Sequence, residues 1–234
     1  TSRDHRHEWF RIADPRSGEV RTVFDEQVPT YYESGNGEVN WQYLPASREA
    51  IWFSERSNWG QLYLYDLADG KLKAPVTAGA GNVTEVLRVD PKTRGLWFRG
   101  VGKEAAWNPY YQAFYKIGLD GKGLTLLTPE VADHTVELSP GGTYFVDSYS
   151  TPDTPPTVVL RRAGDGKTLA EIAHADIGRL RAAGWVPPTA FTVKARDGKT
   201  ELYGEMFKPS HFDPQRKYPI VDYVYPGPQT GSVR

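Results

Sequence analysis

Leu62-Tyr63-Leu64-Tyr65-Asp66-Leu67 leads into the pair Asp69-Gly70, and this stretch decides the fold of the chain. Asp-Gly favours the positive φ angles that a two-residue hairpin turn requires, so the stretch predicts a strand that turns back on itself. A second strand-like run follows the glycine, which completes the hairpin. The same order is found at residues 9–12 before the turn at 15–18, at residues 114–117 before Asp120-Gly121, and at residues 158–160 before Asp165-Gly166.

The hairpin turns are regularly spaced along the chain. Gly18, Gly70, Gly121 and Gly166 lie about 50 residues apart, a period that is typical of propeller blades. Between these hairpins lies a second recurring unit, in which a proline-containing turn joins two strands. Two hairpins per period make the four-stranded unit of a β-propeller, while a β-sandwich with regular turns is the alternative that the spacing leaves open. The second unit recurs at residues 41–53, 87–98 and 136–146.

Composition excludes several classes of function. The 234 residues carry 28 Lys and Arg against 29 Asp and Glu, so no basic field exists to attract nucleic acid or an anionic membrane. No apolar run has the length of a membrane-spanning helix, and the first residues show no signal-peptide pattern. The absence of Cys excludes disulfides and thiolate metal sites but fits a periplasmic, secreted or cytoplasmic location equally. No cofactor is expected.

The repeat stops after His174, and a different organisation follows. Asp176 is expected to cap a short linker helix that Gly184 ends, which places a domain boundary between residues 1–184 and residues 185–234. One more hairpin is predicted around Asp197-Gly198. The continuous apolar run 218–224 then favours a strand covered on both faces, as in an α/β sheet.

Two segments resemble the dipeptidyl peptidase IV family of serine peptidases. One is Trp52-Phe53-Ser54-Glu55-Arg56 with the following Gln61 to Asp66, which is similar to that family's propeller. The other is Phe207 to Pro214 with Lys217-Tyr218-Pro219 and Tyr225-Pro226-Gly227-Pro228, which resembles the entry to its catalytic domain. The resemblance implies an eight-bladed propeller that caps an α/β-hydrolase domain and limits access to it. It also implies release of N-terminal dipeptides after Pro or Ala.

The resemblance assigns one catalytic role in this chain, to Tyr225. It matches the tyrosine whose hydroxyl stabilises the oxyanion formed when the serine attacks the scissile carbonyl. A phenol stays protonated at neutral pH and can donate that hydrogen bond. A strand-end aromatic that only packs on a loop is the alternative, and Pro226 departs from the family's usual residue at the next position.

The rest of the catalytic machinery has no counterpart in the sequence. No serine lies in a Gly-x-Ser-x-Gly elbow, and in this fold the acid and the histidine follow the serine. No motif matches the family's glutamate pair that binds the substrate's amine. We therefore expect a fragment that holds about three blades, part of another and the start of the hydrolase domain, inactive alone, with the natural N-terminus upstream of Thr1. A non-enzymatic propeller or sandwich that binds protein or glycan is the competing hypothesis.

Other polar residues have weaker claims to a site. His5 and His7 could chelate a metal but are more typical of a solvated terminus, and the sequence offers His134 and His174 no local acid–base partner. His211 belongs to the segment shared with the family. The Asp-Gly-Lys triplets that begin at Asp69, Asp120, Asp165 and Asp197 lack the glycine spacing of a phosphate-binding loop, so they are interpreted as turns.

Glu55 and Arg56 form either a buried pair or two charges at the rim of a blade. A group of five aromatic residues, named at the end of this paragraph, suits either core packing between blades or a binding surface. A partial propeller leaves sheet edges unpaired, so we expect self-association of the chain, a homodimeric parent, and peptides as the parent's substrates. The aromatics are Trp97, Phe98, Trp107, Tyr110 and Tyr111.

Overall fold

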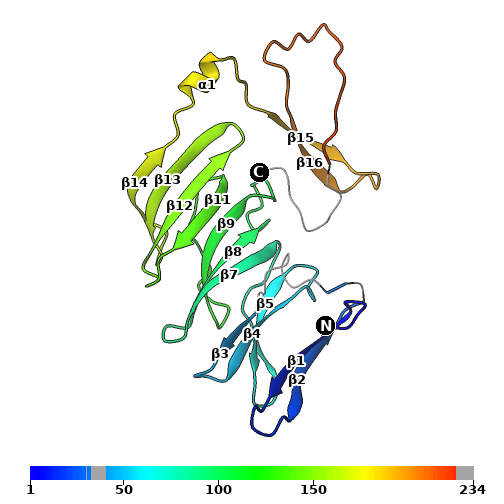
Figure 1. The fold of residues 1–234 in the computed structure, drawn as a ribbon, viewed down its shortest axis with the longest axis vertical. Helices are drawn as coiled ribbons and strands as arrows, with labels where there is room; N and C mark the ends of the chain where they lie inside the picture. Colours follow the sequence, from blue (N-terminus) through cyan, green and yellow to red (C-terminus); the bar gives the residue numbers. More distant parts are fainter. Residues whose placement is uncertain (30, 33–40, 225–234) are drawn as a thin grey trace.

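The computed structural model describes residues 1–29, 31–32 and 41–224, and in that part of the chain nearly all regular structure is antiparallel β-sheet (Figure 1). The first sheet is a hairpin, and three four-stranded sheets follow it in chain order. The first holds β1 (His7–Ala13) and β2 (Val20–Gln27), and the second β3 (Gln42–Leu44), β4 (Glu49–Ser54), β5 (Gln61–Asp66) and β6 (Leu72–Pro75). The third holds β7 (Asn82–Asp90), β8 (Gly95–Val101), β9 (Gln112–Gly118) and β10 (Thr125–Leu126), and the fourth β11 (Asp133–Leu138), β12 (Tyr144–Thr151), β13 (Thr154–Arg162) and β14 (Thr168–His174).

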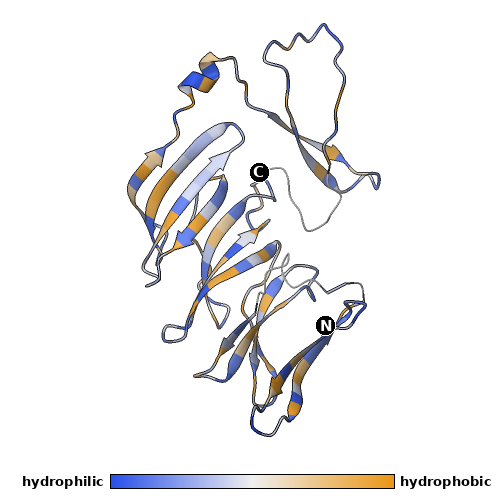
Figure 2. Cartoon of the chain, in the orientation of Figure 1, coloured by the Kyte–Doolittle hydropathy of each residue, from blue (hydrophilic) through white to orange (hydrophobic). Residues whose placement is uncertain are grey.

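Each four-stranded sheet is a meander in which consecutive strands pair. Three such units after a two-stranded hairpin confirm the prediction of a mainly β chain with about three blades and part of another. The β-sandwich alternative is wrong, because successive sheets stack on one another instead of sharing one core (Figure 1). Apolar residues lie mainly within the strands, while the short turns are hydrophilic (Figure 2).

An apolar cluster lies between each pair of neighbouring sheets. Alternate residues of a strand point to opposite faces, so one strand serves two clusters. On β4, Trp52 packs toward the first sheet and Phe53 toward the third. On β8, Phe98 packs toward the second sheet and Trp97 toward the fourth. The second and third sheets are thus covered on both faces, which explains why all six residues of β4 are buried.

The predicted hairpin turns are present, but they are longer than two residues. Gly70 has φ 73° and Gly166 has φ 73°, as the turn chemistry requires. The N–H of Gly70 donates to the carbonyl of Asp66, four residues earlier. Asp69 keeps a negative φ and its side chain accepts a hydrogen bond from the N–H of Lys71. The aspartate therefore stabilises the turn through its side chain and does not supply the second positive φ of a two-residue turn.

The turn glycines also lie close to the preceding sheet. A Cβ added to Gly70 would lie 2.0 Å from the carbonyl oxygen of Val23 on β2. For Gly121 the nearest atom would be the carbonyl oxygen of Pro75 at 2.7 Å, and for Gly166 that of Leu127 at 2.3 Å. Each of these turns rests on the backbone of the sheet before it, so only glycine fits there.

The meanders place their connections at two opposite ends. Short turns such as 67–71 and 163–167 lie at one end, here called the turn end. The connections between sheets, the long loop 102–111 and the turn at 152–153 lie at the other, here called the loop end. After β14 the chain leaves at the loop end through α1 (Gly178–Ala182) into the hairpin of β15 (Thr189–Lys194) and β16 (Glu201–Met206) (Figure 1).

The predicted linker helix forms, although it is short and buries no residue, but its N-cap is Ile177 without a side-chain cap hydrogen bond, so the expectation that Asp176 caps it is wrong. Asp176 accepts a hydrogen bond from the N–H of Gly178 at 2.7 Å, and Gly184 has φ 89° just after the helix end. The predicted strand at 218–224 is wrong: this segment pairs with no other and its side chains are exposed, with Ile220 at 88% and Tyr223 at 91%. A strand needs a hydrogen-bonded neighbour, and in the described part of the chain this segment lies along neither unpaired edge of the β15–β16 hairpin.

A buried ion pair joins the second and third sheets. The side chain of Glu49 on β4 is 1% exposed and accepts hydrogen bonds from Lys73 Nζ at 2.6 Å and from Arg94 Nη1 at 2.7 Å. Arg94 belongs to the turn between β7 and β8, so this carboxylate ties two sheets together. Burial alone raises the pKa of Glu49, but the hydrogen bonds from Arg94 and Lys73 outweigh it and lower that pKa to about 2.

Replacement of Gly70 by Ala is expected to destabilise the fold far more than replacement of Gly18 by Ala. Both glycines have φ 73°, so both substitutions carry the cost of a left-handed alanine, roughly 1–2 kcal/mol. An added Cβ on Gly18 meets nothing within 4 Å, whereas the one on Gly70 overlaps the Val23 carbonyl. Urea denaturation of both variants measures the difference. Equal losses would contradict the contact between the turn and the preceding sheet.

The stability of the chain should fall as the pH drops from about 4.5 toward 2, in part because of Glu49. A pKa lower in the folded than in the unfolded state means that ionised Glu49 stabilises the fold above its usual value of 4.5, and this contribution is lost as the carboxylate is protonated near 2. Glu49→Gln should cost roughly 1.5–3 kcal/mol at neutral pH and flatten this part of the pH profile. Denaturation midpoints across that range test it, and an unchanged profile would refute it.

Candidate functional site at the loop end

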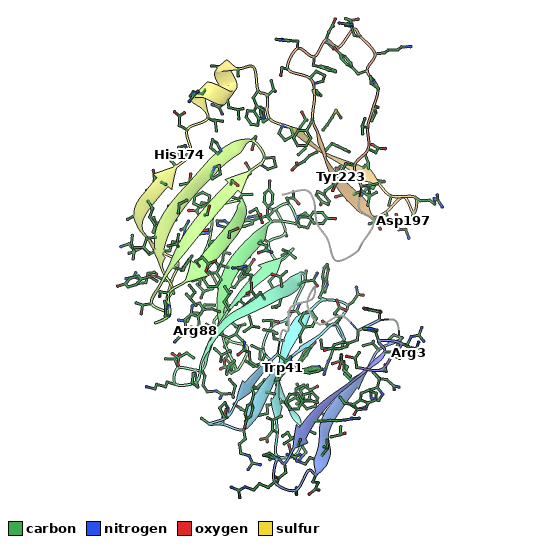
Figure 3. The ribbon with its side chains drawn as sticks, in the orientation of Figure 1. Arg3, Trp41, Arg88, His174, Asp197 and Tyr223 are labelled. Atoms are coloured by element: carbon green, nitrogen blue, oxygen red, sulfur yellow. The ribbon has the colours of Figure 1, made fainter. Side chains whose placement is uncertain are left out.

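Tyr225, the predicted oxyanion donor, lies outside the described residues, as do Pro226 and Pro228. The last described segment of the chain carries Tyr223, which projects into solvent near the β15–β16 hairpin (Figure 3). The role of Tyr225 therefore stays a prediction. Within the described residues, the candidate site is the loop end of the third and fourth sheets, where it faces the β15–β16 hairpin.

A pocket of about 270 Å³ lies where the loop end meets the β15–β16 hairpin. The third and fourth sheets supply one wall through the loop 102–111, the connection 127–132 and the turn after β12. The other wall comes from the segment before β15 and from β15 and β16. Among the described residues the pocket is lined by Asn108, Tyr111, Val131, Thr151, Pro152, Asp153, Pro188, Ala190 and Glu205.

The polar wall of this pocket is anionic. Burial raises the pKa of Glu205, and burial together with the charges of Asp153 and Glu205 raises the pKa of Tyr111. The phenol of Tyr111 therefore stays protonated at neutral pH. None of the described lining residues is Lys, Arg or His.

The five predicted aromatic residues differ in their surroundings: some lie in the core between the sheets and others lie at the loop end. Trp97 and Phe98 are core residues, which confirms the packing interpretation for them. Trp107 is half-buried and stacks on His134, with 6.3 Å between ring centroids. Tyr110 meets Tyr203 of β16 edge-on at 5.8 Å, and Tyr111 lines the pocket. The last two therefore connect the sheets to the hairpin.

A buried charged network lies beneath the loop end. Asp147 on β12 accepts hydrogen bonds from His134 Nδ1 at 2.9 Å and from Arg161 Nε at 2.8 Å. Arg161 also donates to Glu130 at 2.7 Å, and His134 Nε2 contacts the Glu130 carbonyl at 3.0 Å. The sequence around His134 offered no local partner, and the structure supplies one from the neighbouring strand. The network ties the connection that carries Val131 to the fourth sheet.

The same network could suit a metal by residue type, since ligand atoms of Glu130, His134 and Asp147 lie within 4.8 Å of one another. The guanidinium of Arg161 already contacts both carboxylates, and both ring nitrogens of His134 have partners. Arg161 is 1% exposed and supplies the positive charge that a metal would bring. The arrangement fits a structural network and not a metal site.

Most of the other candidate residues have partners on neighbouring segments. His5 stacks on Tyr31, and His7 pairs with Asp25 at 2.5 Å. His174 contacts Thr157. His211 is exposed. Arg56 pairs with the buried Glu26, which its Nη2 contacts at 2.8 Å. Trp52 and Ser54 also donate to Glu26, so this second network joins the first two sheets.

A model of the family described as "Dipeptidyl peptidase IV (DPP IV) N-terminal region" matches residues 1–156. A probable dipeptidyl peptidase 4 of Arthroderma benhamiae is 28% identical over 184 residues, which cover 77% of this chain and 23% of that protein. A probable dipeptidyl-aminopeptidase B of Emericella nidulans is 31% identical over 162 residues, 68% of this chain and 17% of that protein. The chain thus spans about a quarter or less of the length of these relatives.

Solved structures agree with this match. The crystal structure of Porphyromonas gingivalis dipeptidyl peptidase 4 superposes with a TM-score of 0.75 at 23% identity, covering 92% of this chain and 29% of that one. A putative dipeptidyl aminopeptidase IV from Bacteroides ovatus gives a TM-score of 0.74 at 25% identity, covering 93% and 32%. Among the described residues, no helix has the length and apolar character to cross a membrane.

Replacement of Arg161 by Met should be strongly destabilising, because it leaves Asp147 and Glu130 buried or half-buried without their cation. The expected loss is about 3–5 kcal/mol. Arg162→Met is the matched control: the neighbouring side chain is exposed and pairs only with Asp165, so little or no change is expected. Urea denaturation of both variants compares them. A loss for Arg161→Met no larger than that of the control would rule out a buried network.

Proposed function

The chain belongs to the dipeptidyl peptidase IV family, and we propose that it is part of a serine exopeptidase that releases N-terminal dipeptides of the Xaa-Pro or Xaa-Ala type. The observation that carries the proposal is the match of residues 1–156 to the N-terminal region of that family. Relatives that bear the name dipeptidyl peptidase support the reaction class. They favour a peptidase over the binding module that composition alone left open.

We place the boundary between propeller and catalytic domain at residues 184 and 185. The four-stranded repeat ends with β14, and α1 carries the chain to a hairpin whose two strands belong to no blade. In this assignment residues 1–184 are propeller and residues 185–234 begin the hydrolase domain.

The loop end would control access of peptides to the catalytic centre. It gathers the longest connections of the sheets and faces the β15–β16 hairpin, so a substrate that reaches the hydrolase domain passes along it. Short turns on the opposite end leave no comparable surface among the described residues. Substrate size would be limited by the loops and not by the strands, which are fixed by packing on both faces.

Tyr225 would supply one donor to the oxyanion. When the serine attacks the scissile carbonyl, the carbonyl oxygen gains a full negative charge, and a phenol O–H directed at it stabilises that charge more than it stabilises the neutral substrate. The serine elbow, the acid and the histidine would come from other parts of the longer protein. The 234-residue chain alone is therefore expected to show no hydrolysis of a Gly-Pro chromogenic substrate.

In the full-length protein, Tyr225→Phe should lower kcat and kcat/KM by similar factors and leave KM little changed. Loss of one oxyanion donor typically costs about 10²–10³ in kcat. Tyr144→Phe is the matched control, since it removes a hydroxyl from an exposed tyrosine at the turn end of the fourth sheet. Steady-state kinetics on a dipeptidyl substrate, with a melting curve for each variant, measures both. A kcat for Tyr225→Phe within about threefold of the parent would remove Tyr225 from the site.

A further inference from the structure

His134 lies where two loops of the loop end meet. Tyr111 belongs to the loop 102–111 and Val131 to the connection 127–132, and both residues line the pocket that faces the β15–β16 hairpin. His134 is the second residue of β11, just after that connection, and its side chain is fully buried. A buried side chain at this position can contact both loops without reaching solvent.

On one side, His134 holds the connection 127–132 in place. Its Nδ1 lies 2.9 Å from the carboxylate of Asp147, and its Nε2 lies 3.0 Å from the main-chain carbonyl of Glu130. A carboxylate and a carbonyl only accept hydrogen bonds, so a ring that carries both protons donates to both. The side chain of Glu130 is held in turn by Arg161 at 2.7 Å. The connection is therefore anchored twice, and both anchors lead to Asp147, which Arg161 also contacts.

On the other side, His134 contacts the loop 102–111. Its ring faces the indole of Trp107, with 6.3 Å between the ring centroids and 27° between the ring planes. Trp107 also packs on the apolar cluster between the second and third sheets. The neighbouring Asp133 adds a second link, because its carboxylate accepts a hydrogen bond from the N–H of Gln112 at 2.8 Å. Two adjacent residues of β11 thus hold the long loop of the third sheet against the fourth sheet.

These contacts are better explained by positioning than by stability. A buried ionic network is weak evidence for stability, since well-packed apolar residues of similar volume often serve as well or better. The third and fourth sheets already share an apolar cluster, in which the rings of Phe114 and Phe145 meet at 4.9 Å. That cluster fixes the strands. The loops beyond the strands need contacts of their own, and His134 makes one with each loop.

We propose that His134 is a positioning residue that holds the loop 102–111 against the connection 127–132 and so fixes the opening along which a peptide reaches the hydrolase domain. The link between the loops rests on the contacts above. Its effect on peptides rests on the proposed function, in which the loop end limits substrate size. A small substrate passes whether or not the loops are held, whereas a long peptide is admitted more readily when the loops can move apart.

Hydrogen exchange in the 234-residue chain tests the link between the loops. His134→Asn places an amide near the position of Nδ1, where it can still donate to Asp147, but it replaces neither Nε2 nor the ring. The hydrogen-bonded amides of Trp107 and Tyr111 should exchange about tenfold faster in this variant, while that of Asn58 in the loop of the second sheet should be unchanged. Equal acceleration of all three amides, or none at the first two, would overturn the proposal.

A second pair of variants decides the question if His134→Asn does not fold. Trp107→Phe keeps a ring over His134 and should leave the exchange of the Tyr111 amide close to the parent rate. Trp107→Ala removes the ring and should accelerate that exchange about tenfold. Indistinguishable rates in the two variants would mean that the contact between the rings does not hold the loop.

The effect on peptides is measured in the full-length protein. We compare kcat/KM for a long peptide that begins with Gly-Pro with kcat/KM for a Gly-Pro chromogenic substrate, and His134→Asn should raise this ratio about threefold. A purely structural role would lower both values in proportion, because it reduces the amount of folded enzyme. An unchanged ratio would therefore overturn the effect on peptides. Failure of the proposed function looks different, since the parent protein would then cleave neither substrate.

Discussion

The close contact between the last turn of each sheet and the backbone of the preceding sheet governs the architecture. Gly70, Gly121 and Gly166 each bring a turn so near a carbonyl oxygen that a Cβ would collide with it. Because the contact repeats, each sheet takes the same position on its predecessor, and the apolar clusters between the sheets form with it. The glycine that shapes the hairpin therefore also sets how closely the sheets stack.

Because these contacts require glycine, the positions of the blades could be predicted from the regular spacing of the turn glycines in the sequence. Glycines with positive φ at regular intervals marked both the hairpins and the blades, and the alternating strands supplied the apolar faces. Two expectations were wrong for physical reasons. The turns contain more than two residues, because the side chain of Asp69 accepts a backbone hydrogen bond in place of a second positive φ. The apolar segment 218–224 forms no strand, since it is hydrogen-bonded to neither edge of the β15–β16 hairpin nor to any other described strand.

The site was much less predictable. His134, Asp147 and Arg161 meet because three adjacent strands place them on one face, and no short motif records that register. A charged residue within the apolar run that forms β13 was the available signal, since a buried arginine requires acidic partners. Asp153 and Glu205 come together only through the position of the hairpin on the loop end. Tyr225, found by resemblance, lies outside the described residues.

The meander topology has a consequence for how the chain reaches its native state. Strands pair only with their immediate neighbours in sequence, and each sheet packs only on the sheets before and after it. Each strand therefore pairs with a strand that only one turn or loop separates from it along the chain, so little loop entropy is lost before that pairing forms. Each sheet can form soon after its last strand leaves the ribosome, using the preceding sheet as a template. Assembly then proceeds in the order of synthesis, as in repeat proteins whose units contact only their neighbours.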